Sequence, residues 1–118
     1  GKERLTEILT YQIKDIDNAK LKNYDNSTAS GSQIIDLLKN LKEEDGVKVI
    51  VSNGYVIQKS EEAQEYTYEG IHEKDSTILH DILDKTNSSR YINPNASFTS
   101  TVVYDENREI SALIFAQK

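Results

Sequence analysis

Cysteine, methionine and tryptophan are absent from this chain, and proline occurs once, at Pro94. The lack of Cys excludes disulfides, thiolate-bound metal sites and a cysteine nucleophile within these residues. No stretch approaches the roughly 20 consecutive apolar residues that a membrane-spanning helix needs. At 118 residues the chain has the length of one ordinary domain, and Ile, Leu, Val and Tyr are the residues available for its core.

Basic residues are too few to favour nucleic-acid binding. The 14 Lys and Arg residues stand against 20 carboxylates, which gives a net charge of −6, whereas phosphate contacts need a basic surface. The excess is in the second half, because residues 60–118 carry 11 acidic and five basic residues and residues 1–59 carry nine of each. The carboxylates of residues 61–84 include no D-x-[DN]-x-[DN]-G calcium loop, so we interpret them as a solvated acidic surface.

The chain begins with Gly1 rather than Met, and a helical pattern starts within its first residues. Apolar residues at helical spacing predict an amphipathic helix over residues 3–22; they are Leu5, Ile8, Leu9, Ile13 and Ile16. No obvious N-cap residue precedes this pattern. We therefore expect the helix of residues 1–22 to continue upstream, toward a removed N-terminal anchor, signal or partner domain.

Two further helices are predicted downstream of a loop over residues 23–29. Ser30 and Gln33 form a capping-box pattern that begins a helix over 31–44, and Gly46 is placed to end it in a left-handed conformation. Asp75 or Ser76 caps the next helix, over 76–85. Its inward face consists of Ile78, Leu79, Ile82 and Leu83.

The remaining segments favour strands. Asn53-Gly54 between two β-branched runs predicts a hairpin over 47–58, and a short strand is expected at 65–69. A second hairpin pairs residues 97–104 with 109–116 through a turn at 105–108. The sum is one α+β domain over residues 1–118, in which two to three helices pack on an antiparallel sheet of about four to five strands.

Four short stretches carry a family resemblance. They are Tyr24-Asp-Asn-Ser-Thr-Ala-Ser-Gly-Ser-Gln-Ile-Ile35, Tyr91-Ile-Asn-Pro-Asn-Ala-Ser-Phe98, Val102-Val-Tyr-Asp-Glu-Asn107 and Ile114-Phe-Ala-Gln117. Together they resemble a family of small uncharacterised Gram-positive proteins, of the low-GC, clostridial type. The glycine usual in two of that family's turns is replaced here by Asn26 and Arg108. The resemblance implies a compact extracytoplasmic domain that follows a membrane anchor or lipoprotein signal, and it implies no activity.

Catalytic and metal-binding patterns are missing around the two histidines, His72 and His80. No H-x₃-H or H-E-x-x-H spacing joins them, so we expect a half-buried structural role for His80. Ser30-Gly31-Ser32 lacks the G-x-S-x-G elbow, and the capping role already explains Ser30. Tyrosines could form a ligand platform, but packing in the core or on the sheet face is favoured for them; they are Tyr55, Tyr66, Tyr68, Tyr91 and Tyr104. The sequence predicts no catalytic residue, no cofactor and no metal ligand.

The expected function is therefore that of a non-enzymatic extracytoplasmic domain in a membrane-anchored or lipoprotein bacterial protein. It would bind a protein or another cell-envelope partner, and it would meet the membrane only through the removed N-terminal segment. One alternative is a cytosolic adaptor or sensor-like module that dimerises through residues 1–22. Another is an enzyme of unfamiliar type that uses His72 or His80.

Overall fold

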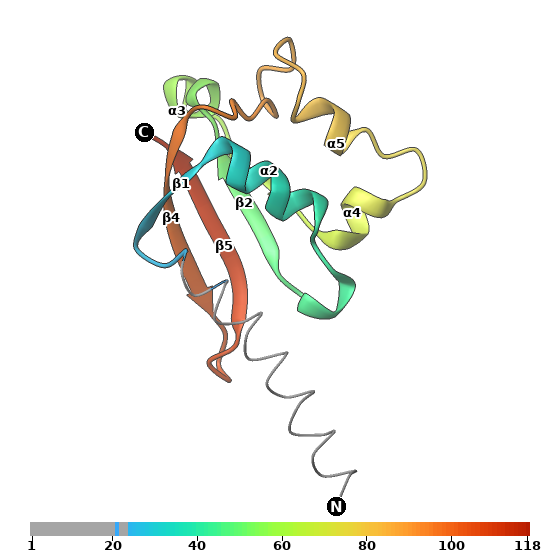
Figure 1. The fold of residues 1–118 in the computed structure, drawn as a ribbon, viewed down its shortest axis with the longest axis vertical. Coiled ribbons are helices and arrows are strands. Elements are labelled where there is room, and N and C mark those ends of the chain that lie inside the picture. Colours follow the sequence, from blue (N-terminus) through green and yellow to red (C-terminus); the bar gives the residue numbers. More distant parts are fainter. Residues whose placement is uncertain (1–20, 22–23) are drawn as a thin grey trace, which may run out of the picture.

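The computed structural model describes residue 21 and residues 24–118 (Figure 1). The helix predicted over residues 3–22, with its suggested continuation toward an anchor, lies outside the described residues apart from Leu21. Leu21 packs against the edge of the hydrophobic core. Because the described residues share one core beside one sheet, the α+β class is confirmed.

Five strands form the sheet, in the order β1-β4-β5-β2-β3. The strands are β1 (Ser27–Ser30), β2 (Lys48–Ser52), β3 (Gln64–Tyr66), β4 (Ser97–Tyr104) and β5 (Ile110–Gln117). Neighbouring strands are antiparallel except for β2 and β5, which run parallel from the pair Lys48–Ala112 to the pair Ser52–Ala116. The prediction of a purely antiparallel sheet is therefore wrong, because a long connection through several helices returns the chain beside β2 in the same direction.

The predicted hairpin at Asn53-Gly54 does not form. Asn53 instead caps helix α3 (Gly54–Lys59), and its side-chain oxygen accepts the Val56 N–H at 2.9 Å. Asn is favoured both in tight hairpin turns and at helix N-caps, so the dipeptide alone does not decide between them. Here the cap prevails because the Asn53 amide nitrogen also donates to the carbonyls of Ser88 and Tyr91.

Helix α2 (Gly31–Lys39) covers one face of the sheet and supplies much of the core (Figure 1). Ile34, Ile35 and Leu38 are buried on the helix, and they face a sheet surface that includes Phe98, Leu113 and Phe115. Along β4, buried residues alternate with exposed ones, as expected for a strand with one covered face. The second hairpin, β4–β5, is confirmed close to its predicted bounds.

Several predicted boundaries are wrong for identifiable reasons. Helix α2 ends at Lys39 rather than 44, and a separate 3₁₀ turn, η1 (Glu43–Asp45), precedes Gly46. Gly46 has a φ of +58° and ends this turn in the left-handed conformation, as predicted for the end of the helix. Strand β1 occupies Ser27–Ser30 within and beyond the predicted loop over 23–29, because pairing with β4 supplies its backbone partners.

The region between β3 and β4 is more irregular than predicted. The expected strand over 65–69 is β3 (Gln64–Tyr66), after which Thr67 caps helix α4 (Tyr68–His72). The expected helix over 76–85 shrinks to α5 (Ile78–Asp81). Ile82 is fully buried, whereas Leu83 is 49% exposed, so the inward role predicted for Leu83 is wrong.

Candidate functional site

The stretches Tyr24–Ile35 and Tyr91–Phe98 contact each other through their backbones. The Gly31 N–H donates to the Ala96 carbonyl at 2.9 Å, and the Ser32 N–H donates to the Pro94 carbonyl at 3.0 Å. A Cβ atom at position 31 would lie 1.9 Å from the Asn93 carbonyl oxygen. Glycine is required there by close packing of two backbones, so these two stretches have a structural explanation without any catalytic role.

Two turns, at Asn26 and Arg108, have a residue other than glycine at a positive φ angle. Asn26 has a φ of +51° and Arg108 a φ of +64°. Glycine adopts this left-handed conformation without strain. Other residues adopt it at an energetic cost, which is smallest for Asn. The turns therefore keep a glycine-type backbone although neither residue is glycine.

Asn53 fixes a long loop to the end of β2. Its side chain is 5% exposed and makes three hydrogen bonds, of 2.8–2.9 Å, to the Val56 N–H and to the carbonyls of Ser88 and Tyr91. Gln117, at the end of the neighbouring parallel strand β5, accepts the Gly54 N–H at 3.0 Å. These contacts hold the beginning of α3, the end of β5 and the loop over 88–91 together at one end of the sheet.

A hollow of about 280 Å³ opens at this end of the sheet, and we name it the β2–β5 hollow. Eight residues line it: Asn53, Gly54, Tyr55, Lys85, Ser88, Tyr91, Asn93 and Gln117. The packing prediction for the tyrosines does not extend to Tyr55, whose side chain is 37% exposed at the rim. No sequence pattern predicts this hollow, because its residues come from four separate parts of the chain.

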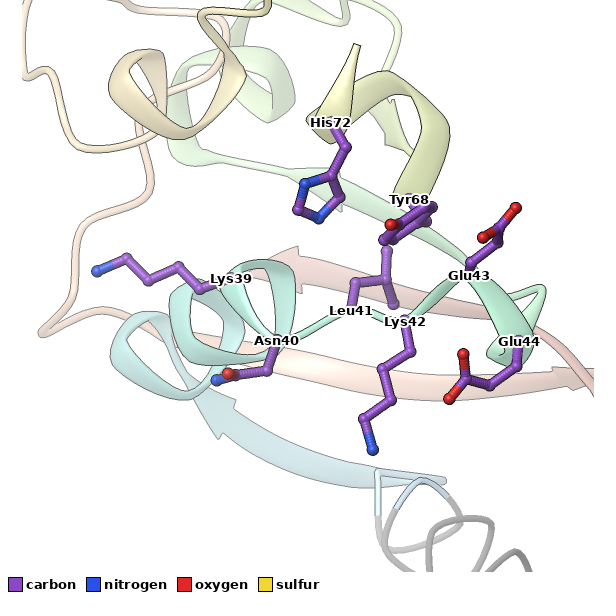
Figure 2. A pocket seen from close by; sticks show the side chains of 8 residues that line it. All are labelled: Lys39, Asn40, Leu41, Lys42, Glu43, Glu44, Tyr68 and His72. Atoms are coloured by element: carbon purple, nitrogen blue, oxygen red, sulfur yellow. The ribbon is translucent and has the colours of Figure 1, made fainter.

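A second hollow, of about 340 Å³, lies between the end of α2 and helix α4, and we name it the ring groove. Its lining residues are Lys39, Asn40, Leu41, Lys42, Glu43, Glu44, Tyr68 and His72. Figure 2 shows the Tyr68 and His72 rings on α4 facing Leu41 across the groove. The groove is wide open to solvent, so it suits a side chain or loop of a partner better than an enclosed small molecule.

The two rings of the groove form a pair along one helix face. Tyr68 and His72 are four residues apart, and their ring centroids lie 4.3 Å apart at an interplanar angle of 41°. Leu41, which is buried, contributes the apolar floor. The Lys39 amine and the Glu43 carboxylate lie toward opposite ends of the groove (Figure 2). The arrangement combines an aromatic wall with opposite charges at its two ends.

Both histidines are exposed in the described part of the chain. His72 is exposed, and within those residues its ring stacks on Tyr68 and makes no hydrogen bond to a carboxylate or a hydroxyl. His80 is also exposed, so its predicted half-buried position is wrong; the short helix α5 turns it toward solvent. Within residue 21 and residues 24–118, no group of three or more His, Asp or Glu residues could hold a metal ion.

Several carboxylates of residues 61–84 have structural partners. Asp81 accepts from the Arg90 guanidinium at 2.7 Å and from the Thr77 hydroxyl at 2.9 Å. Hydrogen bonds from the Thr86 hydroxyl and backbone N–H hold the pKa of Asp84 below its usual value. Glu65 forms an exposed ion pair with Lys48 at 3.3 Å. These groups fix loops and strand edges locally.

Ser30 has the role that its pattern predicts. Its hydroxyl accepts the Gln33 N–H at 3.2 Å, and the Gln33 side-chain oxygen accepts the Ser30 N–H at 2.8 Å. Both partners of the capping box are therefore engaged at the beginning of α2. This use of the hydroxyl gives no support to a nucleophilic serine.

Comparison with protein-family models, with curated proteins and with solved structures found no match for this chain. Among the described residues, no helix combines the length and the apolar character needed to cross a membrane.

Proposed function

We propose that this chain is a non-enzymatic, extracytoplasmic binding domain of a membrane-anchored or lipoprotein bacterial protein, and that it contacts a protein partner through the ring groove. The observation that carries the proposal is the ring pair above Leu41, in which Tyr68 is half-buried and His72 is exposed. Aromatic side chains bring large contact area at low entropy cost, which is why they are enriched where proteins bind one another.

The charges of the groove specify the kind of partner segment that fits. An apolar or aromatic partner side chain would rest on Leu41 and against the Tyr68–His72 ring pair. An acidic group of the partner would be favoured near Lys39, and a basic group near Glu43. The segment that complements the groove is therefore an apolar side chain flanked by opposite charges.

The setting of the two histidines supports a non-enzymatic role. A general base needs a partner that orients its ring, and a nucleophile needs a base within hydrogen-bond reach. Neither imidazole forms a hydrogen bond to a carboxylate or a hydroxyl among the described residues; His80 interacts with Asp84 only electrostatically, and the Asp84 carboxylate accepts from Thr86 instead. The extracytoplasmic location is supported by the family resemblance of the Tyr24–Ile35 and Tyr91–Phe98 stretches alone.

The experiment compares two variants of the full-length protein in its host, each of which adds one cysteine to these 118 Cys-free residues, and the unsubstituted protein gives the background labelling. Glu44→Cys places a thiol in the ring groove without removing Lys39 or Glu43, and Glu106→Cys places a matched thiol in the exposed β4–β5 turn. A membrane-impermeant maleimide is added to intact cells and to the purified domain. We expect both thiols to react in intact cells, with the groove thiol reacting several times more slowly there than in the purified domain.

The control variants replace histidines. His72→Ala should restore fast labelling of the groove thiol in cells, whereas His80→Ala, at an exposed position outside the groove, should not. Labelling that occurs only after cell lysis would contradict the extracytoplasmic location. Equal rates for the groove thiol in cells and in the purified domain would contradict a partner in the groove.

A further inference from the structure

Two of the eight residues that line the β2–β5 hollow, Asn53 and Gly54, use their hydrogen-bond donors within the protein, whereas most of the others carry side-chain donors that have no partner among the described residues. The Lys85 amine and the Tyr55 and Tyr91 hydroxyls make no hydrogen bond or ion pair there. The side-chain oxygen of Gln117 accepts the Gly54 N–H, which leaves its amide NH₂ group for another partner. The oxygen of Asn93 accepts the Asn95 N–H at 2.9 Å, so its NH₂ group is left as well.

These donors stand on a fixed frame. The Asn53 hydrogen bonds hold the loop that carries Tyr91, and the Gly54–Gln117 bond sets the orientation of the Gln117 amide. The Gly31 contact with the Asn93 backbone fixes the far side of the same loop. A ligand would therefore meet donors whose backbones are already positioned, which lowers the entropy cost of binding.

The charge of the hollow is opposite to that of the molecule. Its eight lining residues include one Lys and no carboxylate, in a chain with 20 acidic and 14 basic residues. An isolated ammonium group beside neutral donors favours a ligand rich in acceptor oxygens. The volume of about 280 Å³ has room for more than a bare inorganic anion.

We propose that the β2–β5 hollow binds a small hydroxylated organic anion, such as an acidic or phosphorylated monosaccharide. The ligand's carboxylate or phosphate accepts from Lys85, and its hydroxyl oxygens accept from the Gln117 and Asn93 amides. The rings of Tyr55 and Tyr91 border the remaining atoms of the ligand. The hollow lies apart from the ring groove and shares no residue with it, so this site and the proposed partner site can fail independently.

The experiment titrates the ¹⁵N-labelled domain at low ionic strength with glucuronate and, separately, with glucose 6-phosphate. Glucose and glucosamine serve as neutral and cationic probes of similar shape. We expect millimolar binding of at least one anion, with shifts concentrated at the amides of Gly54, Ser88 and Gln117. Preference for glucuronate identifies a carboxylate ligand, and preference for glucose 6-phosphate identifies a phosphate ligand. Added salt should weaken either complex.

The matched variants are Lys85→Gln and Lys74→Gln, since both lysines are exposed and only Lys85 lines the hollow. Lys85→Gln should weaken anion binding by about tenfold, the effect of losing one charge-assisted hydrogen bond. Lys74→Gln should leave the affinity unchanged. The proposal is overturned if neither anion shifts these amides, if glucose binds as tightly as the anions, or if the two variants bind alike.

Discussion

At the scale of single residues, two side-chain identities are fixed by contacts far away in the sequence. Gly31 is required by the Asn93 carbonyl, and Asn53 by the three backbone groups that it satisfies. The capping role of Ser30 could be predicted because its partners are three residues away. The contacts of Gly31 with Asn93, and of Asn53 with Ser88 and Tyr91, could not, because these partners lie 35 or more residues further along the chain.

Gly31→Ala tests the close approach of the two backbones. Within a helix, alanine is more favourable than glycine by about 1 kcal/mol. The overlap with the Asn93 carbonyl oxygen outweighs this gain, because backbone atoms on both sides must move. We expect a net loss of about 1–3 kcal/mol in the free energy of unfolding, measured by urea denaturation. Ser32→Ala, at the exposed next position, serves as control, and an alanine variant at 31 as stable as the original chain would refute this explanation.

At the scale of elements, the predictions were confirmed where residues close together in the sequence determine the structure. The β4–β5 hairpin and the beginning of α2 are set by neighbouring residues, so they could be predicted. Asn53-Gly54 failed as a hairpin because the side chain of Asn53 serves both α3 and the loop over 88–91. Both hollows went unpredicted for the same reason: each joins elements that only the folded chain brings together.

Asn53→Ala should loosen α3 and the loop over 88–91 together. The substitution removes a helix cap and leaves the carbonyls of Ser88 and Tyr91 without their donor, at a combined cost of about 2–3 kcal/mol. Hydrogen exchange should accelerate at the Val56 and Tyr91 amides more than at amides in the centre of β4. Asn40→Ala, which removes an exposed hydrogen bond, is the control. Uniform acceleration throughout the domain would argue against a local clamp.

At the scale of the whole molecule, the parallel pairing of β2 with β5 decides how the two ends of the sheet are built. It places the carboxyl ends of both strands beside α3 (Figure 1). The β2–β5 hollow opens at this end of the sheet. Composition and periodicity predicted the α+β class but not this pairing, because strand order depends on contacts between distant segments. The core remains a single cluster that joins α2 to the sheet.

The buried hydroxyl of Tyr66 makes the stability of the whole domain sensitive to alkaline pH. Burial raises the pKa of Tyr66 from 10.0 to about 12, and its hydroxyl has no hydrogen-bond partner among the described residues. The unfolded chain therefore loses this proton first as pH rises above 10. The ionisation of Tyr66 leaves the free energy of unfolding unchanged below pH 10. Between pH 10 and about 12 it lowers the free energy of unfolding by up to about 1.4 kcal/mol per pH unit.

Tyr66→Phe should remove the part of the stability loss at alkaline pH that comes from ionisation of Tyr66. At neutral pH the variant should be as stable as the original chain or more so, since it no longer buries an unpaired hydroxyl. Urea denaturation at pH 7, 10 and 11 measures the difference, and Tyr104→Phe, at an exposed tyrosine, is the control. Identical pH profiles for the Tyr66 variant and the original chain would contradict the prediction.

The proposed binding role is tested most directly by one ratio: the labelling rate of the Glu44→Cys thiol in intact cells divided by its rate in the purified domain. A partner in the ring groove predicts a ratio well below that of Glu106→Cys, and a return toward the Glu106→Cys value when His72→Ala is added. Equal ratios for the two thiols, unchanged by His72→Ala, would contradict the role of the groove.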